Sequence, residues 1–360
     1  MNQEISKLIS NYKAPDELGF GQVMAPIMFR SDYANGVWQQ GNLTAFGPIS
    51  LNPAATALQF AQQVFEGMKA YCVSQETPFL FRPEMNFNRL NRSAKRLSMP
   101  TVPASLFAEA LGQMCGALAQ IFPDQPGQSM YLRPTFFGTD PQFAVKGSES
   151  FTFLLLASPS DPYYPAPIKV KIERDHCRAA VGGTGADKVG GNYAASLVAT
   201  HRCLSEGFDQ PLWLDPQERI YIEELSGMNI VVVIDGDLHT PSLSGSILPG
   251  VTRDALLLLA RQAGMETIER RISADYLLRS IEDKKCTEAF ACGTAAIVCP
   301  ISLIGDTLDS ARKLPAVNQI AAELKNTLLS IQEGSNPDIN DWMISASDED
   351  QLQRRLSGDG

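Results

Sequence analysis

A proline-rich stretch near the middle of the chain limits what the chain can fold into more than any other feature. Residues 159–167 contain four prolines. Proline fixes φ and lacks a backbone N–H, so such a run favours a stiff, extended connection. We therefore expect a small N-terminal domain over residues 1–160, a linker over residues 161–171 and a larger domain over residues 172–360.

Hydrophobic patterning on both sides of the prolines predicts a mixed α/β chain. Before them, we expect helices over residues 53–67, 86–97 and 105–121 and strands over residues 68–73, 79–81, 129–138 and 150–157. After them, we expect helices over residues 194–206, 253–263 and 316–332, strands over residues 168–173, 230–234 and 288–292, and a hairpin over residues 212–222.

Composition argues against several classes of partner. The net charge of -10 disfavours nucleic acid and an anionic membrane surface. The apolar run 151–157 is too short to span a bilayer, and the polar N-terminus does not look like a secretory signal. Seven cysteines, none with C-x-x-C spacing, favour a reducing cytoplasm, and three widely separated histidines disfavour a metal site.

The stretch 182–193 carries one lysine, Lys188, and six of its twelve residues are glycine or alanine. Glycine lets a ligand or another segment of backbone come close. A desolvated lysine without an adjacent base suits Schiff-base chemistry at a carbonyl. The phosphate-loop and dinucleotide patterns both fail here. A solvated lysine on a flexible surface loop stays open as an alternative.

Two adjacent glutamates, Glu223 and Glu224, precede a Ser-Gly turn. A carboxylate at this place can keep a heteroaromatic ring nitrogen protonated, which makes the ring an electron sink. A solvated strand edge is the alternative, and either glutamate could be the acid.

Two further stretches could bind anions through backbone N–H groups. Residues 248–254 lead into the predicted helix 253–263, with Thr252 as a candidate N-cap and Val251 beside it. Residues 292–296 are a turn of small residues after a strand. A capped helix and a close-packed turn are the alternatives. Together with the lysine and the acid, these stretches supply what a pyridoxal phosphate site requires.

At this point the chain resembles the branched-chain amino acid aminotransferases, in the fold-type IV group of pyridoxal phosphate enzymes. The resemblance covers nearly the whole chain. It rests on seven blocks in the same order: residues 64–71, 81–90, 131–134, 188–193, Glu224 with 228–229, 248–253 and 293–296. It implies an α/β fold of the α+β type, with a small α/β domain followed by a larger, cofactor-binding domain built on a mixed sheet.

The resemblance also implies the residues that bind pyridoxal 5'-phosphate. Lys188 matches the lysine that binds the cofactor covalently and then moves a proton to or from the substrate's α-carbon. Glu224 matches the acid at the pyridine nitrogen, and Tyr193 matches the tyrosine at the phenolic oxygen. The phosphate group is expected to contact Arg89, Val251, Thr252 and Thr294.

Substrate contacts are carried over in the same way. Thr294 and Ala295 match the turn that binds the α-carboxylate. The side-chain pocket is expected to include the aromatic residues Phe65 and Tyr163 and the polar residues Tyr131 and Arg133. Phe143 and Val145 match a loop that reaches into a partner subunit, which implies a homodimer with shared sites.

Some positions depart from the family's pattern. Phe60 stands where many members have tyrosine, Ser226 and Gly227 stand where animal members have glycine and threonine, and Ala296 replaces a redox-active cysteine and leaves only Cys299.

The activity implied by the resemblance is a reversible, ping-pong transfer of the amino group between L-leucine, L-isoleucine or L-valine and 2-oxoglutarate. Rival activities on the same fold are those of a D-amino-acid aminotransferase and an aminodeoxychorismate lyase. A binding protein that kept the scaffold without catalysis is a rival from another class.

Overall fold

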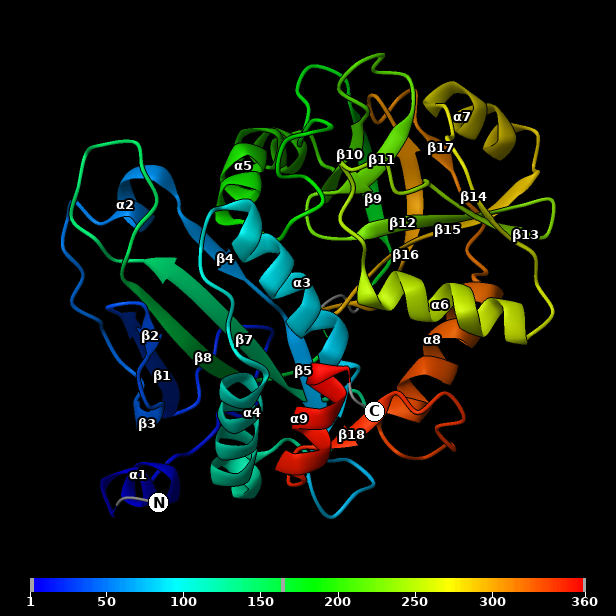
Figure 1. The fold of residues 1–360 in the computed structure, drawn as a ribbon. Helices are drawn as coiled ribbons and strands as arrows, with labels where there is room; N and C mark the ends of the chain where they lie inside the picture. Colours follow the sequence, from blue (N-terminus) through cyan, green and yellow to red (C-terminus); the bar gives the residue numbers. More distant parts are fainter. Residues whose placement is uncertain (1–2, 163–165, 359–360) are drawn as a thin grey trace. The chain divides into compact units, whose positions relative to one another are not determined.

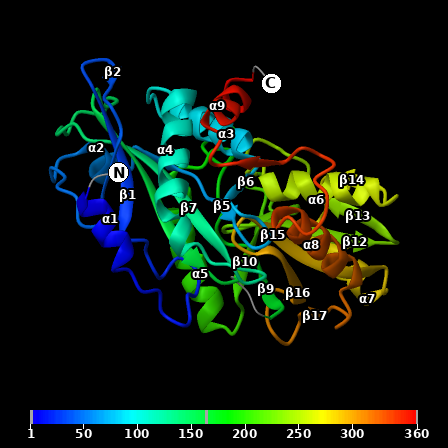
Figure 2. The ribbon, with the colours of Figure 1, turned by 90° about the horizontal axis from the view of Figure 1, so that it is seen from below.

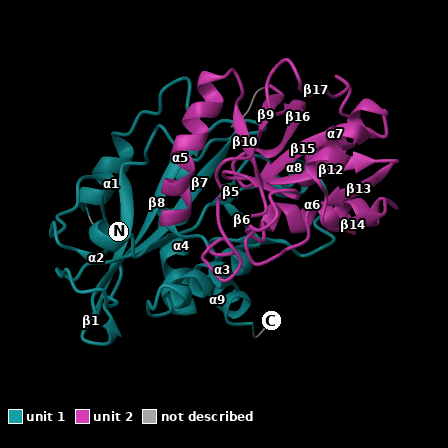
Figure 3. Cartoon of the chain, turned by 90° about the horizontal axis from the view of Figure 1, so that it is seen from above, with its two compact units in different colours: residues 1–163, 188–190, 329–360 teal, residues 164–187, 191–328 magenta. Residues whose placement is uncertain are grey.

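The computed structural model describes residues 3–162 and 166–358. The chain forms two compact units, coloured separately in Figure 3. Unit 1 comprises residues 1–163, 188–190 and 329–360, and unit 2 comprises residues 164–187 and 191–328. Residues 329–360, which the sequence analysis assigns to the second domain, thus pack in unit 1. The predicted domain limits stay a proposal.

Unit 1 contains a nine-stranded sheet within the described residues, in the order β18-β6-β5-β7-β8-β1-β2, with β3 beside β1 and β4 beside β7 (Figure 1). Its strands are β1 (Ile27–Ala34), β2 (Val37–Trp38), β3 (Asn42–Ala45), β4 (Gln63–Phe65), β5 (Met68–Tyr71), β6 (Phe79–Phe81), β7 (Ser129–Gly138), β8 (Phe151–Ser160) and β18 (Met343–Ser345). All neighbouring strands are antiparallel.

The helical segments of unit 1 are α1 (Gln3–Ser10), α2 (Thr56–Phe60), α3 (Pro83–Arg96), α4 (Ala104–Leu118), the 3-10 helix η1 (Ala119–Ile121) and α9 (Glu349–Ser357). Helix α4 contacts β1 and β8, and α9 contacts α3 and α4 (Figure 2). Leu111 of α4, Phe153 of β8 and Leu352 of α9 are buried in one hydrophobic core. Because α9 contributes to that core, the last segment of the chain stabilises the first unit.

Unit 2 contains a second nine-stranded sheet within the described residues. Its strands are β9 (Ile168–Glu173), β10 (Gln210–Leu214), β11 (Ile222–Leu225), β12 (Asn229–Ile234), β13 (Asp237–Thr240), β14 (Thr267–Glu269), β15 (Cys286–Gly293), β16 (Ile297–Gly305) and β17 (Arg312–Lys313). The path β11-β10-β9-β16-β15-β12 closes on itself because β11 also pairs with β12. Parallel and antiparallel pairs both occur, so the sheet is mixed.

The helices of unit 2 are α5 (Gly190–Ser205), α6 (Val251–Gln262), α7 (Ala274–Glu282) and α8 (Gln319–Gln332), although Gly190 and the last four residues of α8 belong to unit 1. Helices α6 and α7 contact β15. Leu277 of α7, Ala289 of β15 and Ile230 of β12 are buried in the same core. Across the described residues, none of the helices combines the length and apolarity that crossing a membrane requires.

Several predicted elements are observed with the predicted bounds, among them strands 129–138 and 168–173. The helix predicted over residues 53–67 is wrong. Helix α2 spans only Thr56–Phe60, because Ala61 takes a left-handed conformation with φ of 51°. The chain then enters β4, which pairs with β7. Val64 and Phe65 are therefore strand residues; Val64 is buried in the core of unit 1.

Strands reach up to and into the range predicted as a linker, residues 161–171. Pro159 and Ser160 end β8, and Ile168–Lys171 begin β9. Pro159 lies opposite Met130 of β7, whereas β1 pairs with β8 only from Phe151 to Leu155. Proline is tolerated at this strand end because no ladder bond to β1 is needed there.

Candidate active site

Lys188 lies in unit 1, where strand-like pairing fixes its backbone. Its N–H donates to Ser93 Oγ at 2.9 Å, and its carbonyl accepts from Phe65 N at 3.1 Å. The next residue, Val189, forms a β-bridge with Val64. The half-buried side chain places Nζ 5.0 Å from the centroid of the Phe65 ring. The lysine is thus anchored by backbone bonds on both sides of its Cα.

A buried ion pair, Glu66 with Arg89, lies in the same unit. Arg89 Nε donates to Oε1 at 2.7 Å, and Arg89 Nη2 donates to Oε2 at 2.8 Å. Asn86 Nδ2 donates to Oε2 at 2.8 Å. Burial by itself would raise the pKa of Glu66, but the charges of Arg89 and Lys188 and these hydrogen bonds outweigh it, so the pKa lies below its usual value. Glu66 is therefore a fixed, buried negative charge.

Arg89 points inward from helix α3. It is 5% exposed. Ser93, one helical turn later, donates its hydroxyl to the Arg89 carbonyl at 2.8 Å while accepting the Lys188 N–H. Helix α3 thereby connects the ion pair to the lysine.

Three of the predicted substrate residues form a cluster in unit 1. Arg133 Nη2 donates to Tyr131 Oη at 2.9 Å. The Arg133 Cζ lies 4.8 Å from the Phe65 ring centroid and 5.3 Å from that of Tyr131. Its Nε is buried without a hydrogen-bond partner among the described residues. This guanidinium lies against two aromatic rings and can still donate to an anion.

The remaining residues predicted for the substrate pocket in the first half are placed differently. Phe143 and Val145 lie on the loop between β7 and β8 and are 77% and 91% exposed. Within one chain they are surface residues. Tyr163 lies outside the described residues.

Glu224 lies in unit 2, at the end of β11, and is 3% exposed. Its Oε1 accepts the Leu248 N–H at 3.0 Å and lies 2.6 Å from Arg178 Nη2. Its Oε2 accepts from Asn229 Nδ2 at 3.1 Å. The carboxylate is thus fixed in orientation and paired with a positive charge.

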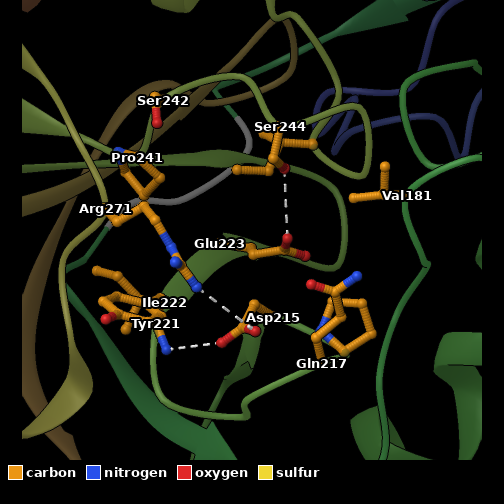
Figure 4. A pocket seen from close by; sticks show the side chains of 12 residues that line it. Val181, Asp215, Gln217, Tyr221, Ile222, Glu223, Pro241, Ser242, Ser244 and Arg271 are labelled. Atoms are coloured by element: carbon orange, nitrogen blue, oxygen red, sulfur yellow. Dashed lines mark hydrogen bonds and ion pairs between the residues drawn. The ribbon is translucent and has the colours of Figure 1, made fainter.

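Glu223 lies on the opposite side of the strand, because successive side chains alternate. It lines a pocket of about 200 Å³ with Asp215, Ser244 and Arg271 (Figure 4). Burial, partly offset by the Ser246 hydroxyl and Arg178, raises the pKa of Glu223. Its Oε2 has no hydrogen-bond partner among the described residues. The two glutamates therefore have different surroundings, and Glu224 is bonded through Leu248 to the segment that leads to Val251 and Thr252.

The N-terminus of α6 differs from the prediction in one respect. The N-cap is Gly250 and not Thr252, and no side chain in the described structure caps the helix. A Cβ at position 250 would lie 2.1 Å from Asn229 Oδ1, so glycine is needed for this close approach. The first N–H groups, at Val251 and Thr252, remain for an anion. These donors fit a phosphate group.

The turn with Thr294 and Ala295 connects β15 to β16. Gly293 pairs with Ile297 across it. Ile297 has φ of 61°, which is strained for a β-branched residue. Register aligns Glu224 with Asn229, and Asn229 with Cys292, so this turn and the acid lie at the same end of neighbouring strands. The small residues leave the backbone of the turn accessible to a carboxylate.

Tyr193 lies in the first turn of α5, in unit 2. Its neighbour Asn192 fixes the preceding loop. Asn192 Nδ2 donates to the carbonyls of Thr184 at 2.7 Å and Asp187 at 3.0 Å, and its Oδ1 accepts from the Thr184 hydroxyl at 2.6 Å. The segment before Lys188 is therefore an ordered loop.

Sequence reasoning missed the partners of the buried charges. It assigned no role to Glu66, Arg178, Asn192 or Asn229. Glu66 fell within a helix that the structure does not contain, and Arg178 fell in a stretch without a predicted element. The available signal was a charged residue followed directly by glycine or alanine, as Glu66 and Arg178 are. In the described ranges, no cluster of three or more His, Cys, Asp or Glu is suited to hold a metal ion.

Comparison with known proteins gives a consistent result. The family model of amino-transferase class IV matches residues 63–304. A branched-chain-amino-acid aminotransferase of Mycobacterium tuberculosis is 41% identical over 337 residues, which cover 91% of this chain and 92% of that protein. The branched-chain-amino-acid transaminase 1 of Bacillus subtilis is 38% identical over 344 residues, which cover 92% of this chain and 94% of that protein.

Solved structures agree. The branched-chain amino acid aminotransferase of Escherichia coli superposes with a TM-score of 0.71 at 25% identity, covering 88% of this chain and 98% of that one. The branched-chain amino acid aminotransferase of T.th., solved in complex with N-(5'-phosphopyridoxyl)-L-glutamate, superposes with a TM-score of 0.70 at 25% identity, covering 90% of this chain and 100% of that one.

Proposed function

Because this chain belongs to the class IV aminotransferases, and within them to the branched-chain-amino-acid aminotransferases, we propose that it reversibly transfers the amino group between L-leucine, L-isoleucine or L-valine and 2-oxoglutarate. The fold is the predicted fold type IV, and the cofactor is pyridoxal 5'-phosphate. When bound, this cofactor withdraws electrons from the substrate's α-carbon and carries the amino group between two half-reactions. The proposal is thus a ping-pong reaction.

The observation that carries the proposal is the connection of a buried carboxylate to an uncapped helix N-terminus. Asn229 donates to Glu224 and, at 3.0 Å, to the Leu248 carbonyl, and it lies against Gly250. An acid for a pyridine nitrogen and N–H donors for a phosphate are therefore built into one hydrogen-bonded unit. In the proposal, Glu224 keeps the ring nitrogen protonated, and Val251 and Thr252 bind the phosphate.

Lys188 is proposed to bind the cofactor covalently and, once released by substrate, to move the proton at the substrate's α-carbon. Its backbone bonds to Phe65 and Ser93 support this role, because they fix the position of its Cα. Arg89 is proposed as a phosphate contact whose orientation is set by Glu66, and Tyr193 as the contact to the phenolic oxygen.

The substrate must be apolar in one half-reaction and carry a second carboxylate in the other. The Phe65–Tyr131–Arg133 cluster supports a proposed pocket for both. Aromatic rings suit a branched side chain, and the guanidinium with its unpartnered Nε suits the second carboxylate of glutamate. The N–H groups of Thr294 and Ala295 are proposed to bind the α-carboxylate, and Tyr163 is proposed to line the pocket.

We further propose a cytoplasmic homodimer in which the loop with Phe143 and Val145 enters the partner's pocket. The high exposure of these two apolar side chains supports this. Changing Val145 to aspartate should weaken the dimer, as measured by analytical ultracentrifugation, whereas aspartate at Val37, another exposed position, should not. Unchanged assembly of the Val145 variant would contradict the proposed interface.

The test of function is the visible absorbance of the purified protein with bound cofactor. Adding L-leucine without an acceptor should shift the absorbance to that of the aminated cofactor, and 2-oxoglutarate should restore it. Lys188→Ala should lose turnover and the covalent absorbance together. A protein that ignores L-leucine but responds to D-alanine would keep the fold and overturn the proposed substrate class.

A further inference from the structure

Arg178 is a buried residue to which no role has been assigned so far. It is 7% exposed and lies ten residues before Lys188 in the chain. Its Nη2 donates to the carbonyls of Gly185 at 2.8 Å and Ser246 at 2.5 Å. The same atom lies 2.6 Å from Glu224 Oε1. One nitrogen therefore contacts three separate segments of unit 2.

Each of the three segments carries part of the proposed site. Gly185 belongs to the ordered loop that leads to Lys188. Ser246 precedes the N-terminus of α6, and Glu224 is the proposed acid. The loop and the Ser246 segment approach closely, because a Cβ at Gly185 would lie 2.3 Å from the Ser246 carbonyl oxygen. Arg178 thus lies where the three segments meet.

The chemistry of Glu224 depends on its charge. A buried carboxylate is costly unless it is paired and hydrogen-bonded. Glu223 shows the consequence on the same strand. Its Oε2 lacks a partner among the described residues, and burial favours its protonated form. Glu224 differs from Glu223 in its direct contact with Arg178 and in the bonds that it accepts from Leu248 and Asn229.

We propose that Arg178 is a positioning residue for transamination: it keeps Glu224 as an oriented carboxylate and fastens it to the loop before Lys188 and to the segment before α6. The guanidinium compensates the buried charge of Glu224, so the carboxylate would accept a hydrogen bond from a protonated ring nitrogen when the cofactor is bound. This inference rests on the proposed role of Glu224. Arg178 Nε is buried without a hydrogen-bond partner in the described structure. Burying an unpaired donor costs stability, and the positioning role gives a reason for keeping the arginine there.

The first experiment needs no bound cofactor. It compares thermal unfolding of the apo-protein for Arg178→Met, Glu224→Gln and the double variant. Because Arg178→Met leaves a buried carboxylate unpaired, it should lower the melting temperature, and adding Glu224→Gln should recover part of the loss. Strictly additive effects would overturn the pairing. Hydrogen exchange at residues 182–187 and 242–247 should quicken in Arg178→Met, and unchanged exchange would overturn the fastening.

The second experiment uses the holoenzyme. Arg178→Met should lower kcat for L-leucine about 10–100-fold, as when a partner that orients a catalytic group is removed, with little change in KM. Arg178→Lys should recover part of kcat because it restores the charge. If Arg178→Met fails to fold, Arg178→Lys is compared with the wild-type enzyme in its place. A fall confined to KM, or no rescue by lysine, would overturn the positioning role.

Arg174→Met is the matched control. Arg174 lies in the same segment and pairs with Asp306, but its side chain is 43% exposed. This variant should behave as wild type in both experiments. If L-leucine did not change the absorbance of the wild-type holoenzyme, the proposed function would be wrong. Wild-type behaviour of Arg178→Met in an active enzyme would sink only this inference.

Discussion

The two units each contain a buried glutamate paired with an arginine and an asparagine, but the two arrangements differ in how the arginine is used. In unit 1, Arg89 forms a bidentate pair with Glu66: its Nε and Nη2 each donate to one oxygen of the same carboxylate. In unit 2, Arg178 approaches Glu224 with one nitrogen, which also donates to two carbonyls. The first arginine completes a pair, and the second connects segments.

The difference teaches that similar buried charges can serve different ends. The bidentate pair fixes the orientation of both the Glu66 and the Arg89 side chains. A shared nitrogen makes the position of a carboxylate depend on two loops. Perturbing the Glu66–Arg89 pair should therefore mainly change stability and reach the cofactor only through the proposed Arg89 phosphate contact, whereas perturbing the Glu224–Arg178 pair should change the proposed acid itself.

Removing the carboxylate of the unit 1 pair should have the largest effect on stability. Glu66→Ala leaves the Arg89 guanidinium buried without its counter-charge, which should cost about 3–5 kcal/mol in the free energy of unfolding. Urea unfolding of the apo-protein measures this. Glu149→Ala is the control, because Glu149 is exposed and its pair with Lys146 is worth at most about 1 kcal/mol. A loss no larger than that of the control would contradict the bidentate pair as a structural support.

The asparagines sharpen the comparison at a smaller scale. Asn86 and Asn229 each donate to the carboxylate of their unit. Asn86→Ala and Asn229→Ala should each cost about 1.5–3 kcal/mol of stability, because a hydrogen bond to a buried charge is lost. Only Asn229→Ala should strongly weaken cofactor binding, since Asn229 also binds Leu248. Fluorescence titration of the apo-variants with pyridoxal 5'-phosphate measures this, and equal weakening by both would remove the distinction.

The smallest expected effect is in the pH dependence of stability, where two glutamates should give opposite slopes. The pKa of Glu66 is lowered in the folded state, so its contribution is present above the usual value of 4.5 and is lost as pH falls. The pKa of Glu223 is raised, so its contribution is present below 4.5 and is lost as pH rises through the folded pKa. Stability of the apo-protein is measured from about pH 2 to 8, so that the range extends below the usual glutamate pKa.

The glutamine variants separate the two slopes. Glu223→Gln should raise stability at pH 7 by about 1 kcal/mol, because an amide does not need to be protonated there. Glu66→Gln should instead reduce the loss of stability on acidification. If both variants changed the pH profile in the same direction, the assignment of opposite environments would be wrong.

How much of this could be read from the sequence differs between fold and site. Strands 129–138 and 168–173 were predictable because their apolar patterning is strong and local. The helix over residues 53–67 was wrong because the left-handed turn at Ala61 depends on the pairing of β4 with β7, which is distant in sequence. Local propensity yields to such pairing.

For the site, motifs predicted candidate residues but not their hydrogen-bond and ion-pair partners. The lysine, the acid and the helix start were each visible as local patterns. The choice between Glu223 and Glu224 stayed open because it depends on which side of a strand faces Arg178, 46 positions away. Likewise, Arg89 was expected at the phosphate, but its bond to Glu66 joins a helix to the end of a strand. Such pairs are set by the fold and leave no local signal.

Residues 188–190 belong to unit 1, although the residues on both sides of them belong to unit 2. Unit 1 also takes in residues 329–360, including β18 and α9. A ribosome releases the N-terminal segments first, but the core around α4 lacks Leu352 until α9 emerges. The unit that carries Lys188 can therefore complete its core only once α9 has been made, so a chain truncated before α9 should leave that core incomplete.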